Sequence, residues 1–197
     1  MFSSGVAWFW DTLAGISMAS GTSAWRILVV RPYVPDAATA HATGLTNVTA
    51  SLMTLRGMVQ VAWARAGGAP MAPRHPLPVE ARRLTSGSLL DVNVTVPVGS
   101  TAAVHVPLID GLQPCTATIR DLMAPNHPVV WTSCRFVANA SPGVVNGSTV
   151  AGWTSQPVLR SAHSGQAEAG TAVKPDLASV AIALSVVSGE YAFGLFA

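Results

Sequence analysis

The sequence predicts a mainly β protein, an antiparallel β-sandwich preceded by one apolar N-terminal helix. Short runs in which apolar and polar residues alternate recur along the chain, and Gly, Pro, Ser and Asn separate them. This pattern is typical of strands with one buried face that are joined by turns. Ahead of these runs, one apolar stretch repeats with helical spacing. Half of the 197 residues are hydrophobic and only 10% are charged, so the chain can bury a core of its own.

The N-terminal helix is predicted over residues 1–16. Its apolar side chains fall on one helical face, at Val6, Phe9, Trp10 and Leu13. A helix with so much apolar surface must be covered by other protein. The sequence allows two covers, the following β domain or a helical domain that lies outside this chain.

The first strands follow a linker of small residues at 17–23. Trp25–Val30 is an apolar run that predicts a strand, and residues 33–46, rich in Pro, Ala and Thr, predict a loop. Asn47–Leu55 and Met58–Ala64 both alternate, and an Arg-Gly turn lies between them. These two runs therefore predict a β-hairpin.

The stretch Leu89–Leu108 has the clearest alternation in the chain. Apolar residues from Leu90 to Val96 alternate with polar ones, which places Asp91 on the solvent face. Pro97–Ser100 breaks the pattern, and it resumes over Thr101–Pro107. Two such runs around a short turn predict a second β-hairpin.

Weaker alternating runs complete the predicted sandwich. They predict further strands at Thr116–Arg120, Val129–Val137, Ser148–Trp153, Ser179–Val187 and Glu190–Phe196. Residues 67–88 and 154–176 show no periodicity and predict long loops.

Several function classes find no support in the sequence. The net charge is +2, and the basic residues form no stripe interleaved with aromatic residues, so no nucleic-acid partner is expected. No apolar run reaches the roughly 18 residues that a membrane-spanning helix needs. The five histidines lack the HExxH spacing and the chain has no G-x-S-x-G segment, so neither a metal, a cofactor nor a nucleophile elbow is expected. The compartment is not determined by the sequence, and secretion is left open.

Two sets of residues are candidates for covalent modification. Cys115 and Cys134 either form a disulfide or remain two small unpaired thiols, and their spacing does not decide between these alternatives. Four N-x-S/T sequons would be candidate glycosylation sites in a secreted chain, and the alternation makes Asn93 the most accessible of them. The four are Asn47, Asn93, Asn139 and Asn146.

Three tryptophans in predicted strands are candidates for a sugar-stacking platform. Trp63, Trp131 and Trp153 could present their rings to a saccharide, or they could fill the core. Core packing is the favoured alternative because large aromatic side chains dominate protein interiors.

Five motifs occur in order along most of the chain. They are SSGVAWFWDTLAGI ending at Ile16, Trp25–Pro32, Thr54 with Gly57 and Trp63, Val94–Pro107, and Ser188–Phe193. This order resembles the last barrel helix and the C-terminal β-sandwich of α-L-rhamnosidases, glycoside hydrolase family 78. Residues 67–88 and 109–178 have no counterpart in the resemblance.

The resemblance implies a two-part organisation and a supporting role. Residues 1–20 would be the terminal helix of an (α/α)6 barrel with its linker, and residues 21–197 a non-catalytic C-terminal domain. The expected partner is the catalytic barrel of a full-length protein, and rhamnose-containing glycans are candidate ligands. Family members use two carboxylates in the barrel for inverting hydrolysis. None of the nine acidic residues here lies in such a motif, so no catalytic residue is assigned.

Two alternatives to the rhamnosidase-like domain stay open. The chain could be a stand-alone carbohydrate-binding β-sandwich, or an inactive truncated remnant. In all three cases the carboxylates are expected to have structural roles. They are Asp11, Asp36, Glu80, Asp91, Asp110, Asp121, Glu168, Asp176 and Glu190.

Overall fold

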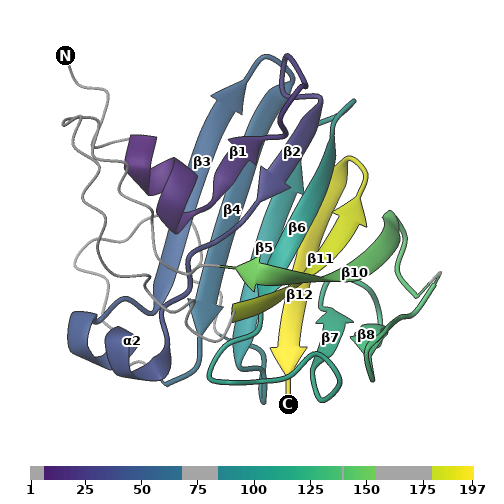
Figure 1. Cartoon of the computed structure of the whole chain (residues 1–197). Coiled ribbons are helices and arrows are strands. Elements are labelled where there is room, and N and C mark those ends of the chain that lie inside the picture. Colours follow the sequence, from purple (N-terminus) through teal and green to yellow (C-terminus); the bar gives the residue numbers. More distant parts are fainter. Residues whose placement is uncertain (1–6, 68–83, 139, 154–178) are drawn as a thin grey trace, which may run out of the picture.

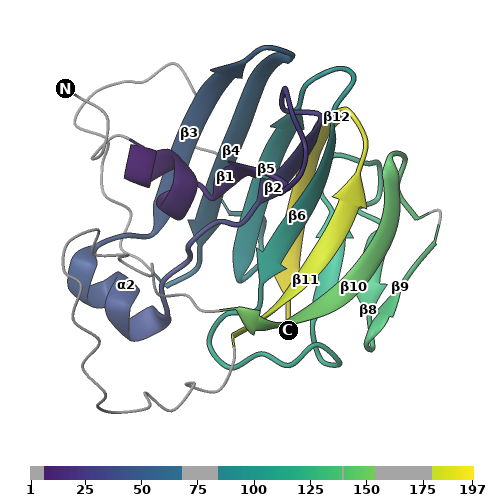
Figure 2. The ribbon, with the colours of Figure 1, turned by 45° about the horizontal axis from the view of Figure 1, so that its top comes forward.

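Two β-sheets pack face to face and form the sandwich that the sequence predicts (Figures 1 and 2). The computed structural model describes residues 7–67, 84–138, 140–153 and 179–197. One sheet has the order β1 (Ile16–Met18), β2 (Ile27–Val30), β6 (Thr101–Pro107), β11 (Ser179–Val186) and β10 (Val144–Trp153). The other has the order β3 (Asn47–Thr54), β4 (Gly57–Arg65), β5 (Leu90–Val96), β12 (Gly189–Phe196), β7 (Thr118–Asp121), β8 (Val129–Thr132) and β9 (Arg135–Phe136). Neighbouring strands are antiparallel except β2 and β6, which are parallel.

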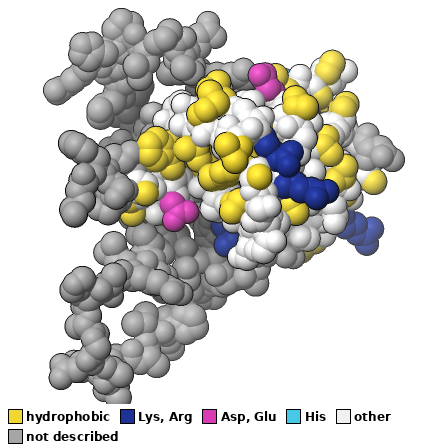
Figure 3. All heavy atoms as spheres, turned by 90° about the horizontal axis from the view of Figure 1, so that it is seen from above, with side chains coloured by type: hydrophobic (Ala, Val, Ile, Leu, Met, Phe, Trp, Pro, Cys, Tyr) yellow, Lys and Arg dark blue, Asp and Glu magenta, His cyan; other side chains and the backbone are white. Residues whose placement is uncertain are grey.

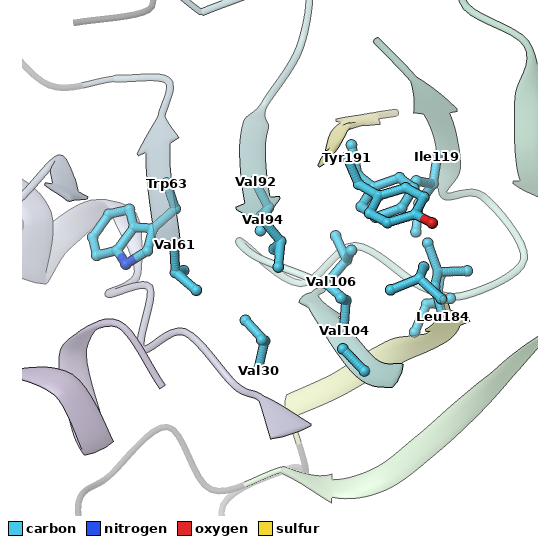
Figure 4. Close-up of a cluster of buried hydrophobic side chains, with 14 of the residues drawn as sticks. Val30, Val61, Trp63, Val92, Val94, Val104, Val106, Ile119, Leu184 and Tyr191 are labelled. Atoms are coloured by element: carbon cyan, nitrogen blue, oxygen red, sulfur yellow. The ribbon is translucent and has the colours of Figure 1, made fainter. Parts of the chain in front are cut away.

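The stretch from β5 to β6 crosses between the sheets, so the hairpin predicted there is wrong. β5 lies in the seven-stranded sheet and β6 in the five-stranded sheet, and the two strands do not pair with each other. Val92 and Val94 reach the core from one sheet, and Val104 and Val106 reach it from the other (Figure 4). Two strands have the same alternation whether they pair edge to edge or face each other across a core, because in both cases one face is buried.

A second crossing connection joins β11 to β12 beside the first. β12 pairs with β5, with Tyr191 opposite Val94. β11 pairs with β6, with Leu184 opposite Val104. Two connections that are far apart in sequence thus lie side by side, and both link the seven-stranded sheet to the five-stranded sheet.

The first predicted hairpin is confirmed. β3 and β4 pair antiparallel along their whole length, with Ala50 opposite Val61. The Thr54 hydroxyl donates to the Gly57 carbonyl (2.7 Å) and closes the turn. Gly57 has φ +123°, which favours glycine at this position.

A helical segment precedes the sheets, but the predicted linker begins too early. η1 (Phe9–Leu13) is a widened turn, in which the Ala14 amide donates to the Phe9 carbonyl (3.0 Å). Residues 16–18, predicted as the end of the helix and the start of the linker, instead form β1 at the edge of the five-stranded sheet. Ile16 is apolar and buried, and it pairs with Val30 of β2. The small residues that follow Ile16 suggested a linker, because composition does not show that a segment pairs with a strand elsewhere in the chain.

The predicted loop over residues 33–46 contains a short helix, α2 (Ala37–Thr43). The carboxylate of Asp36 accepts a hydrogen bond from the Thr39 amide (2.7 Å) as the N-cap. Gly44 ends the helix with φ +71°. Both capping residues were present in the sequence, but a helix of two turns leaves too short an apolar pattern to be recognised.

The run Val129–Val137, predicted as one strand, forms two. Ser133 and Cys134 have φ angles of 49° and 64°, and at these residues the chain turns back so that β9 pairs with β8. Positive φ angles are incompatible with a continuous strand.

The core lies between the sheets (Figure 4). It is mostly aliphatic, with larger side chains toward its ends. The largest fully buried side chains include Trp63, Phe193, Leu28, Leu90, Ile119, Ile182, Leu184 and Leu195. Of the predicted loop at 67–88, residues 84–88 lead into β5, while most of it and the whole of 154–176 lie outside the described residues.

Candidate functional site

The N-terminal segment and the hairpin β3–β4 meet through two tryptophan side chains. The buried indole of Trp63 donates to the carbonyl of Leu13 (2.9 Å). The indole of Trp10 donates to the carbonyl of Ser51 (3.0 Å). Each indole has a single N–H to donate, and in both tryptophans it is used here. The two bonds together attach the helical turn to strands β3 and β4 of the seven-stranded sheet.

Gly15 makes a close backbone contact next to these bonds. The Arg31 amide donates to the Gly15 carbonyl (2.7 Å). Gly15 has φ +70°, and a Cβ atom there would overlap the carbonyl group of Arg31. Only glycine combines this φ with so near an approach of another backbone segment. Ala14 and Ile16, on either side, are buried in the core.

Part of the aromatic surface of the N-terminal segment faces outward. The side chains of Trp8 and Phe9 are 38% and 56% exposed, and their rings meet edge to face at 5.3 Å. Trp10 packs against the core. We call Trp8 and Phe9 the aromatic step.

An ion pair between a buried arginine and an exposed aspartate lies near α2. Arg65 is 4% exposed, and its guanidinium lies 2.7 Å from the Asp110 carboxylate. The same guanidinium donates to the carbonyl of Pro35, and the carboxylate accepts from the Ala37 amide (3.0 Å). Arg65 was not among the candidate residues from the sequence, although an arginine on the apolar face of an alternating strand was a usable signal.

Four of the described carboxylates, those of Asp36, Asp91, Asp110 and Asp121, accept hydrogen bonds from backbone amides. Asp36 caps α2, and the hydrogen bonds from Thr39 lower the pKa of its carboxyl group. Asp121 accepts from the Met123 amide (2.9 Å) and from the hydroxyl of Ser141.

The alternation predicted Asp91 on the solvent face of its strand. This prediction is wrong, since the residue is only 6% exposed. Its carboxylate accepts from the Thr85 amide (2.7 Å), and the turn before β5 covers it. The strand pattern correctly placed Asp91 away from the core, but it carried no information on a loop folding over the outer face.

His105 is the described group with the strongest electrostatic perturbation. It lies on β6 and is 5% exposed. Burial, together with the positive charge of Arg31, lowers its pKa to about 4. His105 is therefore neutral at pH 7. Among the described residues, no group of three or more His, Cys, Asp or Glu side chains could hold a metal ion.

Core packing, the favoured alternative for the three tryptophans, is confirmed for Trp63 and Trp131. Trp63 and Trp131 are 1% and 3% exposed, and their indoles donate to backbone carbonyls inside the fold. Trp153 is in β10, and its side chain lies outside what the structure describes.

The two cysteines and the sequon asparagines lie in different environments. Cys115 and Cys134 are joined as a disulfide, with their Cα atoms 4.2 Å apart. Asn47 and Asn146 are exposed, whereas Asn93 is half-buried between β4 and β12, so it is not the most accessible sequon. Asn139 lies outside the described residues.

Three connections form an open depression at the end of the sandwich that is uppermost in Figure 1. They are the β1–β2 turn, the β5–β6 connection and the β11–β12 connection, and the volume they enclose is about 610 Å³. We call this the loop-end depression. Five hydroxyl side chains and one guanidinium line it, from Thr22, Ser23, Ser100, Thr101, Ser188 and Arg26.

Arg56 holds the loops of this end together from the β3–β4 turn. Its guanidinium donates to the carbonyls of Ala24 and Gly99, both at 2.9 Å. The Ser100 hydroxyl donates to the Trp25 carbonyl (2.8 Å). Ala24 and Trp25 have φ angles of 53° and 59°, which are costly for residues other than glycine. The Arg56 and Ser100 contacts hold them in this conformation.

The described residues define a two-sheet β-sandwich, and comparisons with known proteins show what this fold is similar to. No protein-family model matches the sequence, and no curated protein matches it. Solved structures do match, and two of them are α-L-rhamnosidases. The enzyme from Dictyoglumus thermophilum is similar over 97% of this chain and 13% of its own, with 17% identity and a TM-score of 0.49. The enzyme from Streptomyces avermitilis, complexed with L-rhamnose, is similar over 95% of this chain and 10% of its own, with 20% identity and a TM-score of 0.43.

This chain thus spans a small part of the length of the two α-L-rhamnosidases it is similar to, 13% and 10%. In the part of the chain that the structure describes, no helix has the length and apolar character needed to cross a membrane.

Proposed function

We propose that the chain is the C-terminal, non-catalytic β-sandwich domain of an α-L-rhamnosidase-like glycoside hydrolase. It would support a catalytic (α/α)6 barrel that this chain does not contain. Residues 1–20 would supply the terminal barrel helix and the connection from it, and residues 21–197 the domain itself. The connection would also contribute β1 to the sandwich.

One observation carries the proposal: three of the five family-like motifs meet in space at a single junction. The first motif ends in Ala14-Gly15-Ile16, the second in Arg31-Pro32, and the third in Trp63. Trp63 donates to Leu13, and Gly15 packs directly on the Arg31 carbonyl. These residues are far apart in sequence, yet each limits which side chains its neighbours at the junction can have. Their close fit supports interpreting the motifs as parts of one structural unit.

The carboxylates support a non-catalytic role. Inverting hydrolysis needs two carboxyl groups that face each other across roughly 6.5–9.5 Å with room for water and substrate. Asp36, Asp91, Asp110 and Asp121 each accept hydrogen bonds from backbone amides. Asp36 and Asp110 do so at the start of α2, where Asp110 is also paired with Arg65. Groups used in this way stabilise loops and are poorly placed to exchange protons with a substrate.

The aromatic step supplies the surface on which the barrel would continue. Trp8 and Phe9 belong to the segment that resembles the last barrel helix, and they face away from the sandwich. Their burial against neighbouring helices would stabilise the full-length protein by roughly 1.5–3 kcal/mol per side chain.

The test compares two polypeptides on an aryl α-L-rhamnoside. The 197-residue chain should release no phenol above a mock preparation. A longer polypeptide, extended in frame through the coding sequence upstream of Met1, should hydrolyse the substrate and invert the anomeric centre. Hydrolysis by the 197-residue chain, or an upstream region that encodes no helical barrel with spaced carboxylates, would contradict the proposal.

A further inference from the structure

We propose that the loop-end depression is a binding site for a saccharide that carries a carboxylate, such as a uronic-acid unit. Its volume of about 610 Å³ falls in the range of small-ligand sites. The depression lies at the other end of the β1–β2 pair from the N-terminal junction. The proposal goes beyond the supporting role and does not depend on it.

Arg26 supplies the charge selectivity. It is exposed at the depression, and among the described residues its guanidinium has neither a hydrogen-bond acceptor nor an acidic partner. No residue that lines the depression is acidic. A guanidinium presents paired donors that match the two oxygens of a carboxylate. Figure 3, which looks down on this end, shows arginine side chains set among hydrophobic ones.

The hydroxyl groups supply acceptors for a polyhydroxylated ligand. The hydroxyls of Thr22 and Ser100 donate to the carbonyls of Ala19 (2.6 Å) and Trp25 (2.8 Å). Because the Thr22 hydrogen is already used, its oxygen remains available to accept from a sugar hydroxyl. Ser100 is only 3% exposed, and its contribution is to hold the turn at Trp25 in place. Ser23, Thr101 and Ser188 add hydroxyls that can donate or accept. A lining of this kind suits a sugar better than a bare inorganic anion.

The aliphatic side chains of Ile27 and Val187 complete the lining. They are 39% and 39% exposed and could contact the apolar C–H face of a sugar ring. Sugars present both such a face and a rim of hydroxyls, so the mixed lining matches their chemistry on both counts.

The site is held in shape before any ligand arrives. Arg56 links the turn at Ala24 to the connection at Gly99, and the Thr101 amide donates to the Arg26 carbonyl (3.0 Å). Loops that are already ordered avoid the entropic cost of ordering on binding. Ala24 and Trp25 keep their positive φ angles because the hydrogen bonds from Arg56 and Ser100 hold their carbonyl groups.

The test titrates the 197-residue chain with digalacturonate and with its neutral methyl ester, and follows amide chemical shifts by NMR. Digalacturonate should shift the amides of Arg26, Thr101 and Ser188, and the ester should bind at least about tenfold more weakly. Arg26→Gln should weaken digalacturonate binding to the same degree. Arg135→Gln, which removes an equal charge from the exposed strand β9, should leave the affinity unchanged.

Inorganic phosphate separates a saccharide site from a general anion site. Phosphate at the same concentration should displace little digalacturonate if the hydroxyl lining contributes, and Thr101→Val should weaken the saccharide without changing phosphate binding. Equal binding of both anions, equal binding by Arg26→Gln, or shifts confined to another surface would each overturn the proposal.

Discussion

Gly15 shows how one residue can join two segments. Its left-handed φ and its contact with Arg31 leave no space for a side chain. We expect Gly15→Ala to lower the free energy of unfolding by about 3 kcal/mol, since both the backbone conformation and the contact oppose it. Urea unfolding followed by tryptophan fluorescence measures this change.

Gly21→Ala is the matched control for this prediction. Gly21 has a similar φ of +76°, but nothing lies within 4 Å of the position that an alanine methyl group would occupy. Its substitution should cost only the conformational part, about 1 kcal/mol. Equal losses for the two variants would show that the contact with Arg31 contributes nothing.

His105 gives the protein a predictable pH dependence. Its pKa is about 4 in the folded state, whereas the ordinary pKa of histidine is 6.5. The unfolded chain therefore binds a proton more readily between these values, and the stability contributed by neutral His105 is present above pH 6.5 and lost as the pH falls toward 4. Wild type should lose about 2 kcal/mol more than His105→Gln between pH 7 and pH 4.5. Parallel urea titrations at both pH values measure the difference, and curves that fall by the same amount would contradict the assignment.

At the scale of elements, β1 and the turn before it belong to the sandwich core. Leu13, Ala14 and Ile16 are buried there, and Leu13 also accepts the hydrogen bond of Trp63. An apolar helix considered alone suggests a removable appendage, so that deleting residues 1–20 would leave the sandwich unchanged. The pairing of β1 with β2 leads to the opposite expectation.

We expect deletion of residues 1–20 to destabilise the β domain by more than about 3 kcal/mol, because it removes buried apolar side chains and leaves the Trp63 indole without its acceptor. Deletion of residues 1–8, which spares η1 and β1, is the control and should leave the thermal midpoint nearly unchanged. Thermal unfolding by circular dichroism distinguishes the two. An unchanged midpoint for the longer deletion would mean that the sandwich folds without β1.

At the scale of the whole molecule, the aromatic step is an apolar surface that other protein can cover. Exposed apolar patches of this kind promote association. The double variant Trp8→Ser with Phe9→Ser should therefore lower the self-association of the isolated chain, while its free energy of unfolding changes by less than about 1 kcal/mol. Sedimentation velocity over a range of concentrations measures the association. Met53→Ser with Leu55→Ser, which removes two more exposed side chains elsewhere, tests whether the effect belongs to the aromatic step; an equal decrease would contradict that assignment.

Local sequence patterns determined which segments became strands and which faces were buried. The alternation in β3, β4, β5 and β6 is the direct consequence of side chains pointing to opposite sides of a strand. The Arg-Gly turn between β3 and β4 was short enough to specify their pairing as well. The motif resemblance also pointed to the junction residues Gly15 and Trp63. Gly15 is required by its positive φ and by the close approach of Arg31, and Trp63 fills a buried position and donates to Leu13.

Tertiary structure alone decided how those strands were partnered and where the loops met. β5 and β6 carry the pattern of a hairpin, yet they pair with β12 and β11, because burial of an alternating face does not specify whether the neighbouring strand lies beside it or across the core. The loop-end depression likewise combines Arg26, Ser100 and Ser188, which are distant in sequence. Such a site arises from contacts between segments that only the folded chain brings together, so no local pattern of residues can encode it.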